Sequence, residues 1–257
     1  MGTRGIPSTI LSAWQERVQV APRDIVPTDL ALQAALELQD QLIDLIERQG
    51  GVISGGKIGL SDRRSFAQLG VTEPLSGLLF DHMYLHSGQR LALSDFVQPR
   101  VEGELCLILS ADLDELNLTE QEAARAIAAV APAIEVVDSR WLDWGGSIAA
   151  VVAENVSASF YVCGEPVALT DPGVLASAEM QLSIDGKTVA TGGAQAAYGS
   201  PVKALHWLAQ TLARRGRPLK AGQHVMSGAF ARMTPVQSGQ LVSVEFPGIG
   251  KAELTFG

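Results

Sequence analysis

Three glutamates lie in apolar segments where carboxylates are uncommon. Glu102 and Glu104 are two residues apart in the segment 99–109, and Glu135 lies in the segment 133–140. Side chains two residues apart on a β-strand point to the same face, so Glu102 and Glu104 are expected to share a face. If Glu135 lies on a neighbouring strand, the three carboxylates converge.

Converging carboxylates in a half-buried cleft either take up protons or bind a hard divalent cation. Mg²⁺ or Mn²⁺ is the ion that such an oxygen donor set favours. The alternative is that Glu102 and Glu104 lie on the solvated face of an edge strand, and that Glu135 is a single paired carboxylate. The spacing alone leaves both interpretations open.

Lys57 is a second candidate for chemistry, because it stands at the start of the apolar run 57–60. Partial burial there would lower the pKa of the lysine toward the range useful for proton transfer. The alternative is a surface lysine that extends from a strand end into solvent. The segment 51–57 has the spacing of a phosphate-binding loop, but Ile58 stands where such a loop needs Ser or Thr.

Other polar residues give weaker signals. The segment 154–159 is a polar patch that suits either a turn or hydrogen bonds to a ligand. His82 and His86 are spaced as on one helix face but lack a third ligand, and His206 and His224 are interpreted as isolated packing or surface residues. Motifs of serine hydrolases, zinc ribbons and dinucleotide-binding folds are absent from the sequence.

The composition indicates a soluble globular protein. The 257 residues are 47% hydrophobic, enough for a substantial core, and the formal charge of −9 disfavours nucleic acid or an anionic membrane as partner. An anionic substrate would need a local positive site. Cys106 and Cys163 lie in apolar runs without metal-type spacing, so buried thiols in a reducing compartment are expected. With no signal peptide core and no long apolar span, a cytoplasmic location is expected.

The chain divides near residue 50. Apolar residues at helical spacing predict a helix over 29–48 and a weaker one over 10–18, which makes residues 1–50 a helical N-terminal portion. Residues 51–257 are expected to form a β-rich catalytic domain, so the class is α+β. A helix is predicted from a capping box at Thr119 to about Val130, and another over 201–215. Strands are predicted at 57–60, 104–109, 134–137, 159–162, 180–184, 225–226 and 241–246, with a hairpin turn at Asp185-Gly186.

Several segments together resemble one enzyme family. They are 56–60, 68–74, 99–104, 134–140, 154–157, 219–222 and 226–228. In this order they resemble the hydratase and decarboxylase branch of the fumarylacetoacetate hydrolase superfamily, over most of the chain. The resemblance implies a mixed β-roll core and a lyase that acts on 2-oxo or 2-hydroxydienoate acids of aromatic meta-cleavage catabolism.

The resemblance also implies roles for particular residues. It implies Mg²⁺ or Mn²⁺ on Glu102, Glu104 and Glu135, acid–base catalysis by Lys57, and a substrate contact from Ser157. It further implies a homo-oligomer, and association with another enzyme of the pathway stays open. From the residues themselves, Arg100 and Arg140 are candidates for binding an anionic substrate, or alternatively for structural ion pairs.

Two departures bear on the reaction. Hydratases of this group carry an Asp where this chain has Leu75, and decarboxylases have an apolar residue there, so the resemblance implies decarboxylation of a 4-oxalocrotonate-like substrate first. Hydration of 2-hydroxypenta-2,4-dienoate is the alternative. The segment 197–201 departs from the family's Leu-Gly-His-Pro, which leaves the substrate open. A non-catalytic, metal-free binding or assembly protein is the alternative of another class, and the presence of Lys57 with all three glutamates argues against it.

Overall fold

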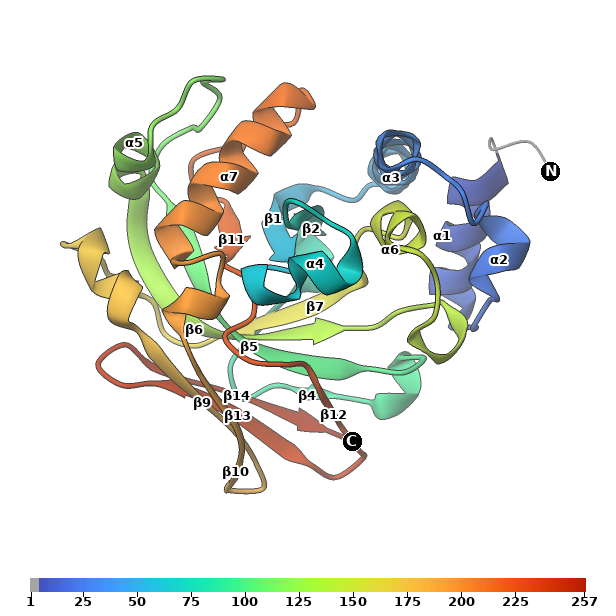
Figure 1. Cartoon of the computed structure of the whole chain (residues 1–257). Coiled ribbons are helices and arrows are strands. Elements are labelled where there is room, and N and C mark those ends of the chain that lie inside the picture. Colours follow the sequence, from blue (N-terminus) through green and yellow to red (C-terminus); the bar gives the residue numbers. More distant parts are fainter. Residues whose placement is uncertain (1–4) are drawn as a thin grey trace.

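A computed structural model describes residues 5–257 of the chain (Figure 1). Three helices come first: α1 (Ile6–Glu16), α2 (Pro22–Ile25) and α3 (Leu32–Arg48). Helix α3 buries its apolar stripe, including Leu38 and Leu42, and packs against α1 and α6 (Ile148–Ala153). The two helices predicted from spacing are therefore present, and α3 begins three residues later than the sequence suggested.

A long curved sheet forms the centre of the molecule, and strands distant in sequence meet in it. Its longest pair, β5 with β6, is antiparallel, whereas β1 with β11 is parallel, so the sheet is mixed. In order, the sheet contains β2 (Leu75–Phe80), β1 (Ile53–Gly59), β11 (His224–Met226), β5 (Arg100–Leu109), β6 (Ile127–Val137), β7 (Ala158–Cys163) and β3 (Tyr84–His86), while β8 (Val167–Ala168) pairs with β6 and β12 (Thr234–Pro235) with β5.

A second sheet packs against one face of the first. Figure 1 shows it below the curved sheet, with most helices above. Gly103 of β5 faces it: a Cβ atom added there would lie 2.7 Å from the Met180 sulfur, so the missing side chain lets the sheets approach. The strands of the second sheet, in order, are β10 (Lys187–Gly193), β9 (Glu179–Ile184), β13 (Leu241–Phe246), β14 (Gly250–Phe256) and β4 (Arg90–Leu91).

Helices cover the opposite face of the curved sheet. Helix α7 (Pro201–Arg214) starts at the N-cap Ser200, whose hydroxyl accepts a hydrogen bond from the Lys203 N–H, and it packs on β1 and β2. The short helices α4 (Phe66–Leu69) and α5 (Glu120–Arg125) lie beside it in Figure 1. Because side chains alternate along β5, the residues on either side of Gly103 point to this helical side.

One predicted helix is wrong in its extent. The capping box exists, since Thr119 and Glu122 exchange backbone and side-chain hydrogen bonds, but α5 ends at Arg125 instead of near Val130. Strand β6 begins at Ile127 because the apolar segment that follows pairs with β5 along almost its whole length. Pairing with β5 therefore determines the structure of this alanine-rich segment, although its residues favour a helix.

The helical spacing of two histidines is also not realised. His82 lies in the 3₁₀ turn η3 (Asp81–Met83), and His86 lies in strand β3.

The hairpin prediction is confirmed, since Asp185 and Gly186 have φ values of 51° and 76° between β9 and β10. The class is α+β, as expected.

The division of the chain at residue 50 stays a prediction. Helix α3 ends at Arg48 and β1 begins at Ile53, and α3 packs against α6, which belongs to the β-rich part.

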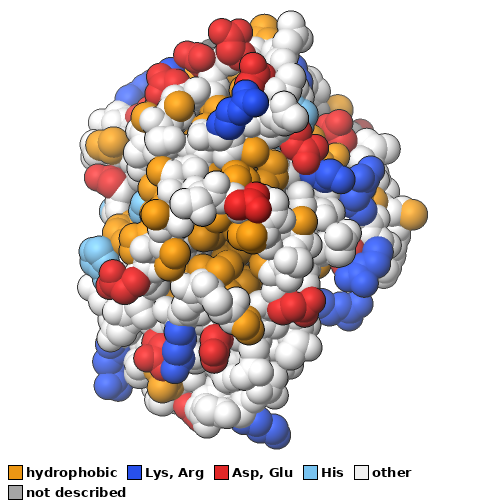
Figure 2. Space-filling model, turned by 90° about the vertical axis from the view of Figure 1, so that its left-hand side faces the viewer, with side chains coloured by type: hydrophobic (Ala, Val, Ile, Leu, Met, Phe, Trp, Pro, Cys, Tyr) orange, Lys and Arg blue, Asp and Glu red, His pale blue; other side chains and the backbone are white. Residues whose placement is uncertain are grey.

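Among residues 5–257, no helix is both long and apolar enough to cross a bilayer. On the face shown in Figure 2, apolar side chains gather near the middle, and charged side chains of both signs surround them.

Candidate active site

The three glutamates converge on the helical side of the curved sheet. Glu102 of β5 stands directly opposite Glu135 of β6 in the strand register, and Glu104 is the next residue of β5 on the same face. One oxygen from each carboxylate lies within 4.8 Å of the others. Glu104 and Glu135 are buried, and Glu102 is half-buried. The edge-strand alternative is excluded, because β5 is paired on both sides.

Lys57 extends from β1 into the same group. Its Nζ lies 2.9 Å from Oε1 of Glu135, and its side chain is only 2% exposed. Strand β11 separates β1 from β5, so the lysine reaches across one strand to meet the glutamates. The alternative of a surface lysine is therefore excluded.

Burial governs the ionisation of these groups. It raises the pKa of Glu102 to about 7, with Glu135 adding to the rise, and it raises the pKa of Glu104 well above its ordinary value. Burial alone would lower the pKa of Lys57, as the sequence suggested. The charge of Glu135, together with those of the other two glutamates, outweighs burial and raises it instead. The lysine is held as an ammonium ion.

The donor set fits a hard divalent cation. Oε1 of Glu104 and Oε2 of Glu135 are buried and have no hydrogen-bond partner among the described residues. Buried carboxylate oxygens without partners are costly, and a cation bound among them would satisfy both. Mg²⁺ and Mn²⁺ prefer oxygen donors of this kind.

A backbone donor from the loop after β11 fixes Glu104. The Gly228 N–H donates a hydrogen bond of 2.8 Å to Oε2 of Glu104. Gly228 has a φ of +93°, and a Cβ atom there would lie 2.6 Å from the Ser61 hydroxyl, so glycine suits this position. No role for Gly228 was assigned from sequence, although a glycine just beyond the end of a predicted strand is a usable signal.

Glu154 connects the segment after β6 to the loop that carries Ser157. Its Oε1 accepts hydrogen bonds from the Ser157 hydroxyl at 2.8 Å and from the Ser139 hydroxyl at 2.6 Å, and its Oε2 accepts one from the Arg140 N–H. Burial raises the pKa of Glu154 to about 7. Sequence reasoning placed Glu154 in a polar turn and missed this central position.

The loop itself has an unusual backbone. Asn155, Val156 and Ser157 have φ values of 62°, 55° and 54°, in the left-handed region that non-glycine residues seldom adopt. The Asn155 side chain stabilises it by accepting from the Leu78 N–H and donating to the Leu78 C=O, each at 2.8 Å. Ser157 is thereby buried with its hydroxyl turned to Glu154.

The two candidate arginines contact aromatic rings. The Arg100 guanidinium lies 4.6 Å from the ring centroid of Trp144. The Arg140 guanidinium lies 4.5 Å from the ring centroid of Trp14 and also donates to the Asp138 carbonyl oxygen. Arg140 is thus held by Trp14, by Asp138 and, through its backbone N–H, by Glu154.

A basic hollow lies near the Gly228 loop. Phe230, Ala231 and Tyr198 form part of its lining. Its four basic side chains outnumber its one acidic side chain, Asp62, which pairs with Arg64, so the hollow has the net positive charge that an anionic substrate would need. It was not found from sequence, because its basic side chains come from three separate segments. They are Arg63, Arg64, Lys203 and Arg232.

Comparison with known proteins decides the family. The model described as fumarylacetoacetate (FAA) hydrolase C-terminal matches residues 78–256. The chain belongs to the fumarylacetoacetate hydrolase family. The match covers the whole second sheet and all of the curved sheet except β1 and the first half of β2, and it includes the three glutamates.

Similar proteins place the chain in the hydratase and decarboxylase branch of the fumarylacetoacetate hydrolase family. The "TodF product hydratase" of Pseudomonas putida (strain F1) is 36% identical over 248 residues, which are 96% of this chain and 92% of that protein. The 2-keto-4-pentenoate hydratase of Paraburkholderia xenovorans (strain LB400) is 36% identical over 250 residues, with the same coverage. The chain is therefore an enzyme of this branch.

A solved structure shares nearly the whole fold. The 4-oxalocrotonate decarboxylase from Pseudomonas putida G7, complexed with magnesium and adipate, superposes with a TM-score of 0.93 at 26% identity, covering 99% of this chain and 97% of that one. A second structure of that enzyme is complexed with calcium and acetate. This family resemblance confirms the fold expected from the sequence motifs.

Glu154 should give this fumarylacetoacetate hydrolase family member a pH-dependent stability. Its pKa is 4.5 ordinarily and about 7 in the fold, so the folded state keeps a proton that the unfolded chain releases. This stabilisation is complete below the unfolded pKa and is lost as the pH rises through the folded pKa. We expect Glu154→Gln, which mimics the protonated acid, to flatten the fall in thermal midpoint between about pH 5 and pH 7.5.

Thermal unfolding of both proteins in saturating Mg²⁺ measures this difference. The exposed substitution Glu115→Gln is the control and should keep the wild-type slope. An unchanged slope in Glu154→Gln would show that Glu154 is ionised in the folded protein.

Proposed function

We propose that this enzyme is a divalent-metal-dependent lyase that acts on a 2-oxo or 2-hydroxydienoate acid of aromatic meta-cleavage catabolism. The observation that carries the proposal is the buried Lys57–Glu135 ion pair beside Glu102 and Glu104. It places a proton donor next to a carboxylate group that suits a divalent cation. Family membership and the magnesium complex of the similar decarboxylase support the proposal.

Glu102, Glu104 and Glu135 are the residues that would hold the cation, Mg²⁺ or Mn²⁺. When bound, the cation supplies positive charge for the oxygens of a 2-oxo carboxylate and for the negative charge that develops during the reaction. Gly228 keeps Glu104 in place through its N–H, and strand pairing keeps Glu102 opposite Glu135. These contacts fix the carboxylates before any ligand arrives.

Lys57 would transfer the proton. Loss of CO₂ from a 2-oxo-3-enedioate leaves a dienolate, which takes up a proton on oxygen to give a 2-hydroxydienoate or on carbon to give a 2-oxo acid. The ammonium group of Lys57 is buried and held 2.9 Å from Glu135, so it is fixed in one place and is kept protonated by the carboxylates. In a hydratase the same group would move a proton within the 2-hydroxydienoate before water adds.

Decarboxylation is the first candidate. Leu75 is buried at the start of β2 in an apolar cluster that includes Val152 and Val156, so this position offers no carboxylate to hold a water molecule. The TM-score of 0.93 with the decarboxylase agrees with this choice. Hydration is the second candidate, favoured because the hydratases are 36% identical and the decarboxylase 26%.

The remaining parts of the proposal concern binding. The basic hollow would attract a dianionic substrate, while Ser157, Arg100 and Arg140 stay proposed substrate-binding residues. Ser157 already donates to Glu154, so a substrate contact would use its hydroxyl as an acceptor or replace that bond. A homo-oligomeric state, and association with another enzyme of the pathway, are likewise part of the proposal.

Two substrates distinguish the candidate reactions. Purified protein with Mg²⁺ is incubated separately with 2-oxohex-3-enedioate and 2-hydroxypenta-2,4-dienoate, and ultraviolet absorbance and released CO₂ are followed. We expect CO₂ from the first substrate and no consumption of the second. Consumption of the second without CO₂ would instead identify a hydratase. A protein that binds Mg²⁺ and is inert to both would refute the proposed substrate class.

Mg²⁺ should stabilise the chelator-treated protein by mass action. At a hundredfold excess over Kd the gain is about 2.7 kcal/mol, which raises the thermal midpoint by roughly 5–10 °C for a chain of this size. Glu104→Gln should abolish this response. Glu245→Gln removes an exposed glutamate from a strand of the second sheet and should respond like the wild type. Normal Mg²⁺ stabilisation of Glu104→Gln would show that Glu104 is not a ligand.

Lys57→Met should remove turnover while keeping the Mg²⁺ response. The substitution keeps an unbranched apolar stem but removes the terminal ammonium group that donates the proton, so kcat should fall by roughly 10²–10⁴-fold, the usual contribution of a general acid–base residue. Kinetics and thermal shifts are measured at saturating Mg²⁺, where the cation compensates the carboxylates that lose the ammonium group. A Lys57→Met enzyme with wild-type kcat would overturn the role of Lys57.

A further inference from the structure

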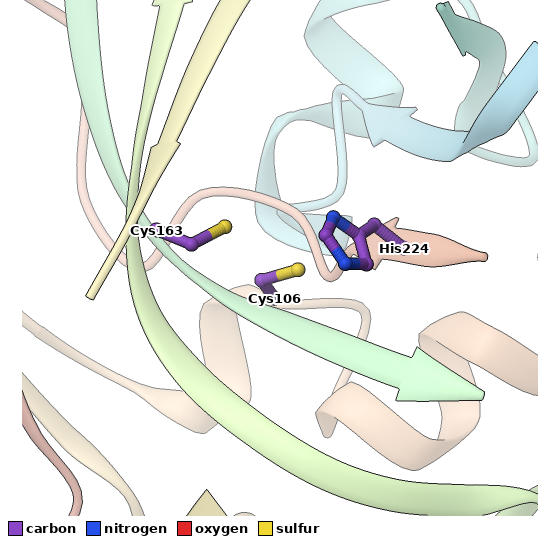
Figure 3. Close-up of side chains that lie close together, drawn as sticks. All are labelled: Cys106, Cys163 and His224. Carbon is purple, nitrogen blue, oxygen red and sulfur yellow. The ribbon is translucent and has the colours of Figure 1, made fainter. Parts of the chain in front are cut away.

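A second group of ligand-type side chains lies outside the proposed reaction centre. Cys106 of β5, Cys163 at the end of β7 and His224 at the start of β11 each offer one donor atom, and these atoms lie within 4.8 Å of one another. Figure 3 shows both sulfur atoms on the side that faces the imidazole ring. Their spacing in the sequence, 57 and 61 residues apart, gives no metal-binding motif.

The strand register explains why the two sulfurs meet. Cys106 is paired with Ala131 of β6, and Cys163 is paired with Ala133 of the same strand. Ala131 and Ala133 are two residues apart and so share a face, which places both cysteines on that face as well. The small methyl groups between them leave room for the thiols to approach across β6.

The same register brings the histidine to this face. Met226 of β11 is paired with Cys106, and His224 is two residues from Met226. The Tyr161 hydroxyl lies 3.2 Å from Nδ1 of His224 and 3.4 Å from the Ser54 hydroxyl. With Nδ1 engaged by a phenol, Nε2 is the nitrogen left to bind a ligand, an arrangement that orients many metal-binding histidines.

The surroundings are closed. Both cysteines are free thiols with exposed fractions of 0% and 5%, and His224 is half-buried. The rings of Tyr84 and Tyr161 contact the imidazole edge-on. Two sulfurs and one imidazole nitrogen in such a site select thiophilic cations and discriminate against Mg²⁺ and Ca²⁺, which prefer oxygen.

We propose that Cys106, Cys163 and His224 form a second metal site that binds a thiophilic d¹⁰ cation such as Zn²⁺. Metal–ligand bonds of about 2.3 Å to sulfur and 2.0 Å to nitrogen need the donor atoms to close by roughly 1.3 Å at most. Three protein ligands leave a fourth tetrahedral position for water. The bound ion would join β5, β7 and β11, and Cys106 is two residues from Glu104, so it would also brace the strand that carries the oxygen site.

Co²⁺ tests the site, because its absorption depends on its ligands. The full-length protein is treated with chelator, reduced with a phosphine and titrated with Co²⁺. We expect thiolate-to-cobalt charge-transfer absorption in the near ultraviolet and visible bands of tetrahedral Co²⁺, saturating at one equivalent and abolished by Zn²⁺. Co²⁺ bound to carboxylates gives no such charge-transfer band. Its absence from the reduced wild-type protein would overturn the proposal.

Variants separate this site from the proposed reaction centre. Cys163→Ser and His224→Gln should lose or strongly weaken the charge-transfer band, whereas Glu104→Gln should retain it. Conversely, Cys163→Ser should keep the Mg²⁺ stabilisation that Glu104→Gln loses. A charge-transfer band that persists in both Cys163→Ser and Cys106→Ser would show that the cobalt binds elsewhere.

X-ray absorption of the Zn²⁺-loaded wild type needs no variant, and so keeps the proposal testable if a substitution prevents folding. We expect sulfur neighbours at about 2.3 Å from zinc. A zinc shell of oxygen and nitrogen alone would contradict the proposal.

Discussion

The ion pair between Lys57 and Glu135 is the interaction on which the rest of the structure depends. Both side chains are almost fully excluded from water, and two further carboxylates lie beside them. Removing one partner of a buried ion pair typically costs several kcal/mol, because the other charge is left without compensation. One ammonium group cannot balance three carboxylates, so the site favours either bound protons or a divalent cation. That imbalance is the physical basis of the proposed metal binding.

The fold keeps these charged side chains close together, because hydrogen bonds hold the strands and the loop around them in place. The paired strands β5 and β6 fix the distance between Glu102 and Glu135, and the Gly228 N–H fixes Glu104. On the other face of β5, the missing side chain of Gly103 lets Met180 of the second sheet pack closely against this strand. Charged groups that would separate in a flexible protein are thus kept together by the strand pairing and by a backbone hydrogen bond to Glu104.

The same face of the curved sheet carries two donor sets of opposite character. Oxygen donors gather where β5 starts, and two residues further along the strand sulfur and nitrogen donors begin with Cys106. Hard and soft cations are distinguished by such donors more than by position. Alternate residues of a strand point to one side, so β5 contributes Glu102 and Glu104 to the oxygen donors and Cys106 to the sulfur and nitrogen donors.

The sequence by itself determined the features that depend on local pattern. Helical periodicity located α3 and α7, the Asp-Gly pair located a hairpin, and the two-residue spacing placed Glu102 and Glu104 on one face. Where local patterns conflicted with long-range pairing they failed: the alanine-rich segment after α5 joined β6, because pairing with β5 outweighed helix propensity.

Only the tertiary structure decided which distant residues meet. The register of β5 with β6 put Glu135 opposite Glu102, and the loop after β11 brought Gly228 to Glu104. Burial of Lys57 was expected to lower its pKa, but the carboxylates that surround it reversed the direction. The approach of Cys106 to His224 depends on strand order, which sequence spacing does not encode, because a sheet joins strands whatever their separation along the chain.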